Sequence, residues 1–252
     1  MQNMDIKGLI AQMYSNDETN IAVLDYSTGR EISYAELIGH VNDVIDIMKY
    51  QEIEMNEPTV IVSKNIYDTV ASIIAILYYG AQIEGCNVSL GLIEAEIARI
   101  SKTSMNISRQ PTILVSSSFV NIETLVASVI CGAKVVILDE NSTDAEVVRC
   151  LKRVRPHLVV TSTTYAEKLV RADLYQKLLD AKNTNMLSFA HTRRMVFRQL
   201  KRHFLFTLGG CIQSVAIYDT KPFNTEIEQL LKRIEFPYQL IPFVRKGCTQ
   251  IL

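Results

Sequence analysis

"PTVIVSKNIYDTVASIIAILYYGAQIEG", residues 58–85, and "PTILVSSSFVNIETLVASVICGAKVVILDE", residues 111–140, repeat one sequence pattern. Each copy begins with Pro-Thr and a short apolar run, 60–62 in the first and 113–115 in the second, and a serine follows each run. Apolar runs of this length are typical of strands that are buried on both faces. The repeat therefore predicts two buried strands at corresponding positions.

The remainder of each copy has the same order of helix, glycine and apolar run. A helical stretch covers 69–79 in the first copy and 123–131 in the second, and a glycine follows it. Glycine ends helices because it adopts the left-handed conformation at little cost. A second apolar run follows at 81–83 and at 133–138. The sequence thus predicts two βαβ units, which build two parallel sheets or two halves of one.

Composition and charge exclude several classes of protein. The chain has 252 residues, of which 48% are hydrophobic, and its net charge is −1. No uncharged apolar run reaches the roughly 18 residues that a membrane-spanning helix needs. A net charge near zero provides no overall attraction to nucleic acid. We therefore expect no transmembrane segment and no nucleic-acid partner.

The cysteines and the start of the chain indicate the compartment. The five cysteines are scattered and form no CxxC pair, which suits reduced thiols better than disulfides or zinc. The first residues, "MQNMDIKGLIAQMYSNDETN", lack the pattern of a secretion signal. These observations predict a cytoplasmic protein.

Other segments predict further strands and helices. Residues 21–25 and 31–33 flank the turn-forming "YSTG" and predict a hairpin. Ser33 and Glu36 have the spacing of a capping box, in which the serine and the glutamate each bond the backbone of the other at a helix start. "TDAE", residues 143–146, repeats this device.

The second half of the chain continues the alternation of strands and helices. We expect a strand at 157–160, then a basic helix, a strand at 204–208 ("FLFTL") and a two-glycine turn. A helix around 225–234 and a strand at 238–243 complete it.

The order of these segments resembles the adenylate-forming superfamily, which includes acyl-CoA synthetases, nonribosomal-peptide adenylation domains and luciferases. The resemblance spans nearly the whole chain, and the basic helix and glycine pair are most similar to long-chain acyl-CoA synthetases. The segments that carry it are "ISYAELIGHVNDVIDIM", "VIVSKNIYDTVASIIAILYYGAQIEGCN", "ILVSSSFVNIETLVASVICGAKVVIL", "TTYAEKLV", "MVFRQLKRHFLFTLGGC" and "KGCTQ".

The resemblance implies an α/β fold of two stacked, pseudo-symmetric lobes with mainly parallel sheets, as in the N-terminal domain of adenylate-forming enzymes. The first lobe, with the hairpin, would comprise 1–106 and the second 107–252. Residues 60–62 and 113–115 would then be interior strands of different sheets. The alternative is a pair of independent βαβ units in another doubly wound protein.

The phosphate loop of that superfamily has no counterpart here. The family carries a Ser/Thr/Gly-rich loop ending in Pro-Lys-Gly, whose glycines let the backbone approach the phosphates. Between the segments that bracket it, only about "ISKTSMNISR", residues 100–109, remains. A lookalike at 161–168 has no glycine and follows the wrong strand, so we interpret it as the start of a helix.

The resemblance implies a vestigial nucleotide-binding role for two pairs of residues. Gly209 and Gly210 would correspond to the glycines against which the family places adenine, although a tight turn explains them equally well. Gly247 and Thr249 match the terminal motif of the family.

Two positions of that terminal motif depart from the family pattern. Lys246 replaces the usual aromatic residue, and Gln250 replaces the glutamate that holds Mg²⁺. A neutral amide lacks the anionic charge on which such hard-cation sites rely. The sequence therefore predicts no catalytic residues, no metal site and no bound ATP or Mg²⁺ cofactor.

The run "RRMVFRQLKRH", residues 193–203, concentrates basic side chains. Two interpretations stay open for it. The run is a surface for phosphate or acidic lipid, or it is the solvated face of a helix.

Together these features predict a truncated relative of acyl-CoA synthetases, without the C-terminal domain that carries the family's catalytic lysine. A non-catalytic pseudoenzyme fits best. It would bind a small molecule, with an acyl or adenine group, or a protein partner near acyl-activating enzymes, and would form a homodimer or a hetero-complex. The alternative is an enzyme, either a ligase completed by a partner chain or a repurposed cleft with other chemistry.

Overall fold

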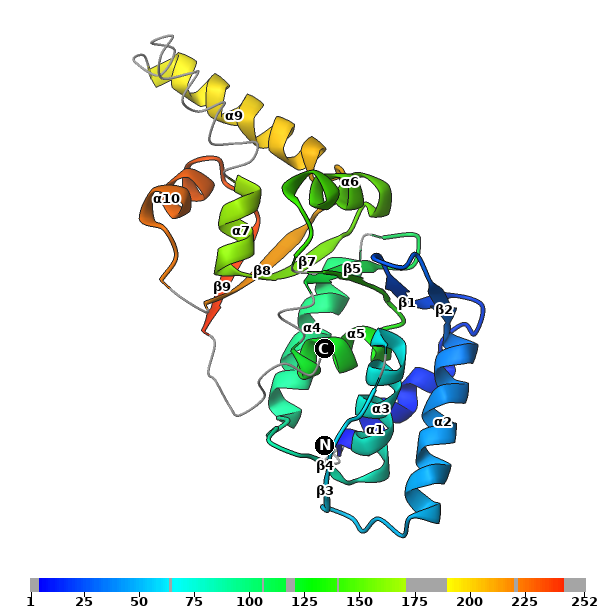
Figure 1. The fold of residues 1–252 in the computed structure, drawn as a ribbon. Helices are drawn as coiled ribbons and strands as arrows, with labels where there is room; N and C mark the ends of the chain where they lie inside the picture. Colours follow the sequence, from blue (N-terminus) through cyan, green and yellow to red (C-terminus); the bar gives the residue numbers. More distant parts are fainter. Residues whose placement is uncertain are drawn as a thin grey trace. The chain divides into compact units, whose positions relative to one another are not determined.

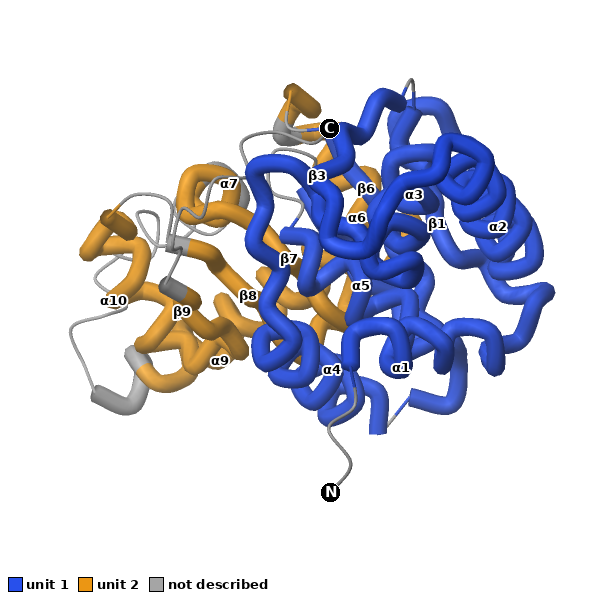
Figure 2. Tube along the Cα trace, turned by 90° about the horizontal axis from the view of Figure 1, so that it is seen from below, with its two compact units in different colours: residues 1–139, 244–252 blue, residues 140–243 orange. Residues whose placement is uncertain are grey.

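The chain divides into two compact units, which Figure 2 colours separately. Unit 1 comprises Met1–Asp139 and Val244–Leu252, and unit 2 comprises Glu140–Phe243. The computed structural model describes residues 5–63, 65–105, 107–116, 121–139, 141–170, 190–219 and 222–242.

Unit 1 combines a sheet with a group of helices. In Figure 1 the helices α2 to α5 lie on one side of strands β1, β2 and β5. Its elements are α1 (Ile6–Ile10), the 3₁₀ helix η1 (Ala11–Ser15), β1 (Ile21–Asp25), β2 (Glu31–Ser33), α2 (Tyr34–Tyr50), β3 (Pro58–Thr59), α3 (Ile66–Tyr79), β4 (Gln82–Ile83), α4 (Leu90–Ser104), β5 (Thr112–Ser116), α5 (Ile122–Ile130) and β6 (Lys134–Leu138).

The larger sheet of unit 1 has the strand order β2-β1-β6-β5. Strand β6 is parallel to both β1 and β5, with Val135 opposite Ile113, whereas β1 and β2 form the predicted antiparallel hairpin. The middle residues of β5 and β6 are buried, as expected for strands covered on both faces. The second copy of the repeat is therefore the predicted βαβ unit.

The first copy of the repeat differs from the prediction at its first strand. Only β3, residues Pro58–Thr59, pairs with β4, and it does so in a separate two-stranded sheet. Val60 and Val62 lie beyond this pairing and are 62% and 91% exposed. The prediction that 60–62 and 113–115 are interior strands of different sheets is wrong for the first run, because 60–62 forms no strand and is largely exposed, whereas 113–115 lies in β5. Because β4 ends at Ile83, the run has no described strand beside it.

Local sequence signals explain where the helices begin and end. The capping boxes of Ser33 and Thr143 are both formed. Asn65 caps α3 by accepting a hydrogen bond from the backbone of Asp68, and Gly80 ends this helix in the left-handed conformation. These helix boundaries therefore follow from short stretches of sequence.

In the described residues of unit 2, three parallel strands have the order β7-β8-β9. The predicted strand at 157–160, helix at 225–234 and strand at 238–243 are confirmed within two residues. Its elements are α6 (Asp144–Val154), β7 (Leu158–Ser162), α7 (Thr163–Leu169), α9 (Ala190–Thr207), β8 (Ser214–Asp219), α10 (Thr225–Arg233) and β9 (Tyr238–Pro242).

The predicted strand "FLFTL" at 204–208 is wrong, because α9 continues to Thr207. Val196, Leu200, Phe204 and Leu208 are buried at intervals of four residues, which is the spacing of one helix face. The apolar run is thus the last turn of an amphipathic helix, and the strand follows it at β8.

The α/β class with mainly parallel sheets is confirmed in both units. Strands β5 and β6 group with unit 1, so the compact units differ in range from the predicted lobes, 1–106 and 107–252. As folding domains, those two lobes stay a prediction.

Candidate functional site

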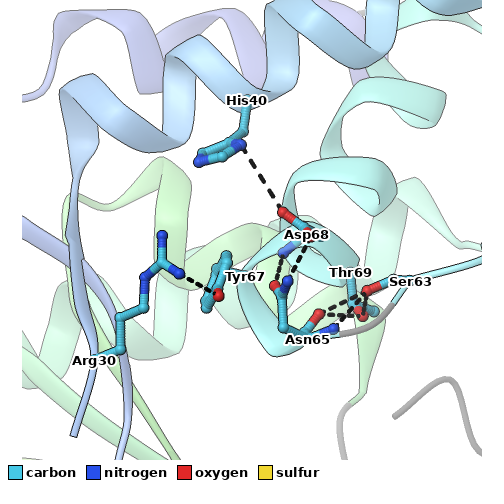
Figure 3. Close-up of polar contacts among 7 residues, drawn as sticks. All are labelled: Arg30, His40, Ser63, Asn65, Tyr67, Asp68 and Thr69. Atoms are coloured by element: carbon cyan, nitrogen blue, oxygen red, sulfur yellow. Dashed lines mark hydrogen bonds and ion pairs between the residues drawn. The ribbon is translucent and has the colours of Figure 1, made fainter. Parts of the chain in front are cut away.

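A group of polar side chains surrounds the start of α3, and we call it the α3 cluster (Figure 3). The side chain of Asn65 accepts from the backbone N–H of Asp68 at 2.8 Å and donates to the Asp68 carboxylate. A carboxylate in the first turn also interacts favourably with the helix dipole. The cluster consists of Arg30, His40, Ser63, Asn65, Tyr67, Asp68 and Thr69.

Two hydroxyl groups of the α3 cluster hold the turn that leads into the helix. The Ser63 hydroxyl donates to the Asn65 carbonyl at 2.6 Å, and the Thr69 hydroxyl donates to the Ser63 oxygen at 2.8 Å. Ser63 is the serine that follows the first apolar run of the repeat, and the sequence pattern alone assigns it no role. Its role here is a side-chain to backbone bond of the kind that stabilises helix entries.

Side chains from other elements complete the α3 cluster. The guanidinium of Arg30, beside β2, lies 4.1 Å from the ring centroid of Tyr67 and donates to its hydroxyl. His40 of α2 contributes a ring whose Nδ1 is 3.9 Å from an Asp68 oxygen (Figure 3). That distance is too long for a hydrogen bond. The contacts therefore fasten the hairpin and α2 to α3, and they do not form the serine–histidine–carboxylate relay of a hydrolase.

The predicted nucleotide-binding glycines follow a helix instead of a strand. Both have positive φ values, 96° at Gly209 and 77° at Gly210. A Cβ atom at Gly209 would lie 2.4 Å from the carbonyl oxygen of Leu151 in α6, whereas one at Gly210 would meet nothing within 4 Å. Gly209 is therefore required by close packing against α6. A nucleotide-binding role for the pair stays a prediction.

The other predicted site positions, Gly247, Thr249, Lys246 and Gln250, lie outside the described residues.

The resemblance would place the family's phosphate loop near 100–109, and in the structure this stretch consists of the end of α4 and most of the connection from α4 to β5, residues 105–111. It contains no glycine. The Gln110 side chain donates to the carbonyl oxygens of Ile21 at 2.7 Å and Gly132 at 3.1 Å, and the Lys134 backbone donates to the Pro111 carbonyl. These bonds tie the end of the connection to β1 and β6.

The lookalike of the phosphate loop at 161–168 is the entrance to α7, as predicted. Ser162 caps this helix by accepting from the backbone of Tyr165. Nearby, Thr161, Phe204, Leu208 and Phe236 line an apolar cavity of about 20 Å³ in unit 2. This volume is near that of a single water molecule. The cavity has no room for an acyl chain or adenine.

Two of the described cysteines are unreactive, and the described ranges contain no candidate metal cluster. Burial raises the pKa of the Cys131 thiol and raises that of Cys150 to about 12, so both are poor nucleophiles at neutral pH. No group of three or more metal-ligating side chains occurs in the part of the chain that the structure describes. Cys86 is disulfide-bonded, which contradicts the expectation of reduced thiols, so the cytoplasmic location stays a prediction.

Comparisons with known proteins identify the fold. No protein-family model and no curated protein sequence matches the chain. Many solved structures are similar to it, and three proteins illustrate them. They are o-succinylbenzoate CoA synthetase from Bacillus subtilis (TM-score 0.61, 11% identity, covering 97% of this chain and 60% of that one), a luciferase-like enzyme from the mealworm Zophobas morio (0.60, 10%, 95% and 72%) and the N-terminal domain of FACL13 from Mycobacterium tuberculosis (0.57, 8%, 96% and 75%).

These similarities confirm the predicted resemblance to adenylate-forming enzymes at the level of the fold. The chain spans about three fifths of the length of the CoA synthetase. A shared fold at this identity does not carry activity, substrate or partner with it. In the described part of the chain, no helix is both long and apolar enough to cross a membrane.

Proposed function

We propose that this chain is a non-catalytic, partner-binding relative of adenylate-forming enzymes that works beside enzymes activating acyl groups. One observation carries the non-catalytic part of the proposal, namely the short connection from α4 to β5. Adenylation needs backbone amides, a lysine and Mg²⁺ around the transferred phosphates. Residues 105–111 provide neither a glycine nor a lysine for that purpose.

The purified chain should not form an acyl-adenylate. With Mg²⁺, ATP and a panel of fatty, aromatic and amino acids, we expect pyrophosphate exchange no faster than with heat-treated protein, because the transition-state charge lacks its stabilising groups. The CoA synthetase from Bacillus subtilis with o-succinylbenzoate serves as the positive control. Exchange clearly above the heat-treated sample would contradict the proposal. Exchange that appears only with a second polypeptide would favour the rival, a ligase completed by a partner.

An exposed apolar segment supports the partner-binding part. Val60 and Val62 project into solvent next to a sheet that pairs only Pro58–Thr59 with Gln82–Ile83. Two-stranded sheets are marginal by themselves, and unpaired β-branched edges are templates for another strand. Residues 60–62 therefore fit best as a contact with another chain, and we propose that the other chain is a second copy of this protein.

Light scattering coupled to gel filtration should give twice the monomer mass of 28.5 kDa. The double variant Val60→Ser, Val62→Ser should elute as a monomer, because it removes the apolar area at the contact. Leu92→Ser, which changes an exposed apolar residue of α4, is the control and should stay dimeric. A monomeric wild-type chain, or a variant that remains a dimer, would contradict this assignment.

A further inference from the structure

Helix α9 carries an exposed row of arginines, Arg194, Arg198 and Arg202. Residues four apart lie on one face of a helix, and the three Cα positions span about 12 Å along it. The sequence of α9, "AHTRRMVFRQLKRHFLFT", has no acidic residue. The three guanidinium groups form no ion pair within the described part of the chain. Among the described residues, the row therefore concentrates positive charge that no acidic partner neutralises, on a chain whose net charge is −1.

Packing in unit 2 fixes the direction in which this row points. Val196, Leu200 and Phe204 occupy the other face of α9 and are buried, and the Phe204 ring lies 5.0 Å from that of Phe236. Figure 1 shows α9 next to α6. The core thus holds α9 in one rotational setting, so the arginines face solvent together.

Exposed apolar side chains accompany the arginines. Phe206 follows Arg202 by four residues and is 74% exposed, and Met195, next to Arg194, is half-exposed. Each costs free energy in water because its apolar surface stays hydrated. A helix face that combines cations with exposed aromatic and aliphatic side chains is typical of attachment to a bilayer surface, where cations meet headgroups and apolar groups enter the boundary with the acyl chains.

We propose that this arginine face of α9 docks on an anionic lipid bilayer. Arg194, Arg198 and Arg202 bind headgroup phosphates or carboxylates, and Phe206 and Met195 enter the region just below the headgroups. A straight row on one helix matches a planar array of anions. Nucleic acid fits less well, because high affinity for its backbone requires many cations and the chain as a whole has no positive field.

Co-sedimentation with vesicles tests the proposal. The full chain should bind vesicles of phosphatidylcholine mixed with phosphatidylserine, should not bind phosphatidylcholine alone, and should be released by high salt. The triple variant Arg194→Gln, Arg198→Gln, Arg202→Gln should bind about 100-fold more weakly. Each basic residue near such a surface strengthens binding about fivefold. Failure of the wild type to prefer anionic vesicles would overturn the proposal.

A matched variant distinguishes the effect of the α9 arginines from the effect of total positive charge. Lys152→Gln, Arg153→Gln, Arg233→Gln removes the same charge from exposed positions of α6 and α10. It should keep more than half of the wild-type binding, and equal losses in the two triple variants would count against the α9 face. Circular dichroism checks that both variants are folded.

A second change tests the apolar contribution. Phe206→Ser should weaken binding to anionic vesicles and make the remaining binding more sensitive to salt, because only the electrostatic part is left. Unchanged binding and salt dependence would contradict the insertion of Phe206. Tighter binding of single-stranded RNA than of vesicles at the same salt would assign the face to nucleic acid and overturn the proposal.

Discussion

Replacing Gly209 by alanine should lower the free energy of unfolding by about 4 kcal/mol, which is a large part of the stability of an ordinary domain. Two causes add at this position. The backbone has a φ of 96°, which an L-residue adopts only with strain. The new Cβ would also lie 2.4 Å from the Leu151 carbonyl and 3.2 Å from the Cα of Arg155, so the end of α6 would have to shift.

The neighbouring glycine is the matched control for this prediction. Gly210 also has a positive φ, 77°, but a Cβ there meets no atom within 4 Å. Gly210→Ala should therefore cost only the backbone strain, about 1 to 2 kcal/mol. Urea unfolding followed by circular dichroism gives both values. Equal costs in the two variants would mean that contact with α6 does not determine the residue at 209.

The sequence predicted best those elements that depend on neighbouring residues. The capping boxes at Ser33 and Thr143 and the helix-ending Gly80 each involve residues within one helical turn, so a single sequence contains the whole signal. The prediction of a strand at 60–62 is wrong because a strand does not depend on neighbouring residues alone. A strand exists only if another strand lies beside it, and the local run of valine and isoleucine cannot show that the pairing ends at Thr59.

The α3 cluster likewise combines residues that act on their own turn with residues that only the fold brings to it. Ser63 and Asn65 act on their own turn, and the sequence shows the serine directly after the apolar run. The predicted helix begins only at 69, so the capping role of Asn65 was not predicted. Arg30 and His40 reach Tyr67 and Asp68 from positions far away in the sequence, so only the fold brings them together. The prediction of a strand at 204–208 ("FLFTL") is wrong because a short apolar run is compatible with both a buried strand and the end of a helix. The four-residue spacing that continues from Val196 was the signal that decides for the helix.

Removing the carboxylate of Glu96 should cost about 3 to 5 kcal/mol, because it would leave a buried arginine without its partner. Glu96 and Arg99 form an ion pair on α4, with side chains only 11% and 13% exposed. Glu96 also accepts a hydrogen bond from the Thr124 hydroxyl of α5 at 3.0 Å. The Nη1 atom of Arg99 is buried without a hydrogen-bond partner in the described part of the chain, so the remaining bonds to Glu96 matter more. Urea unfolding of Glu96→Leu measures the loss.

Two further variants distinguish a buried charge from a general packing defect. Glu96→Leu combined with Arg99→Met replaces the pair by apolar side chains of similar size, and it should regain most of the stability that Glu96→Leu loses, since no charge is then left buried. Asp46→Asn breaks the exposed pair of Asp46 and Lys49, which has the same three-residue spacing, and should cost less than about 1 kcal/mol. If the double variant were no more stable than Glu96→Leu alone, the cost would come from shape and the ion pair would not be what joins α4 to α5. Recovery in the double variant, with little change at Asp46, would establish that burial gives this pair its importance.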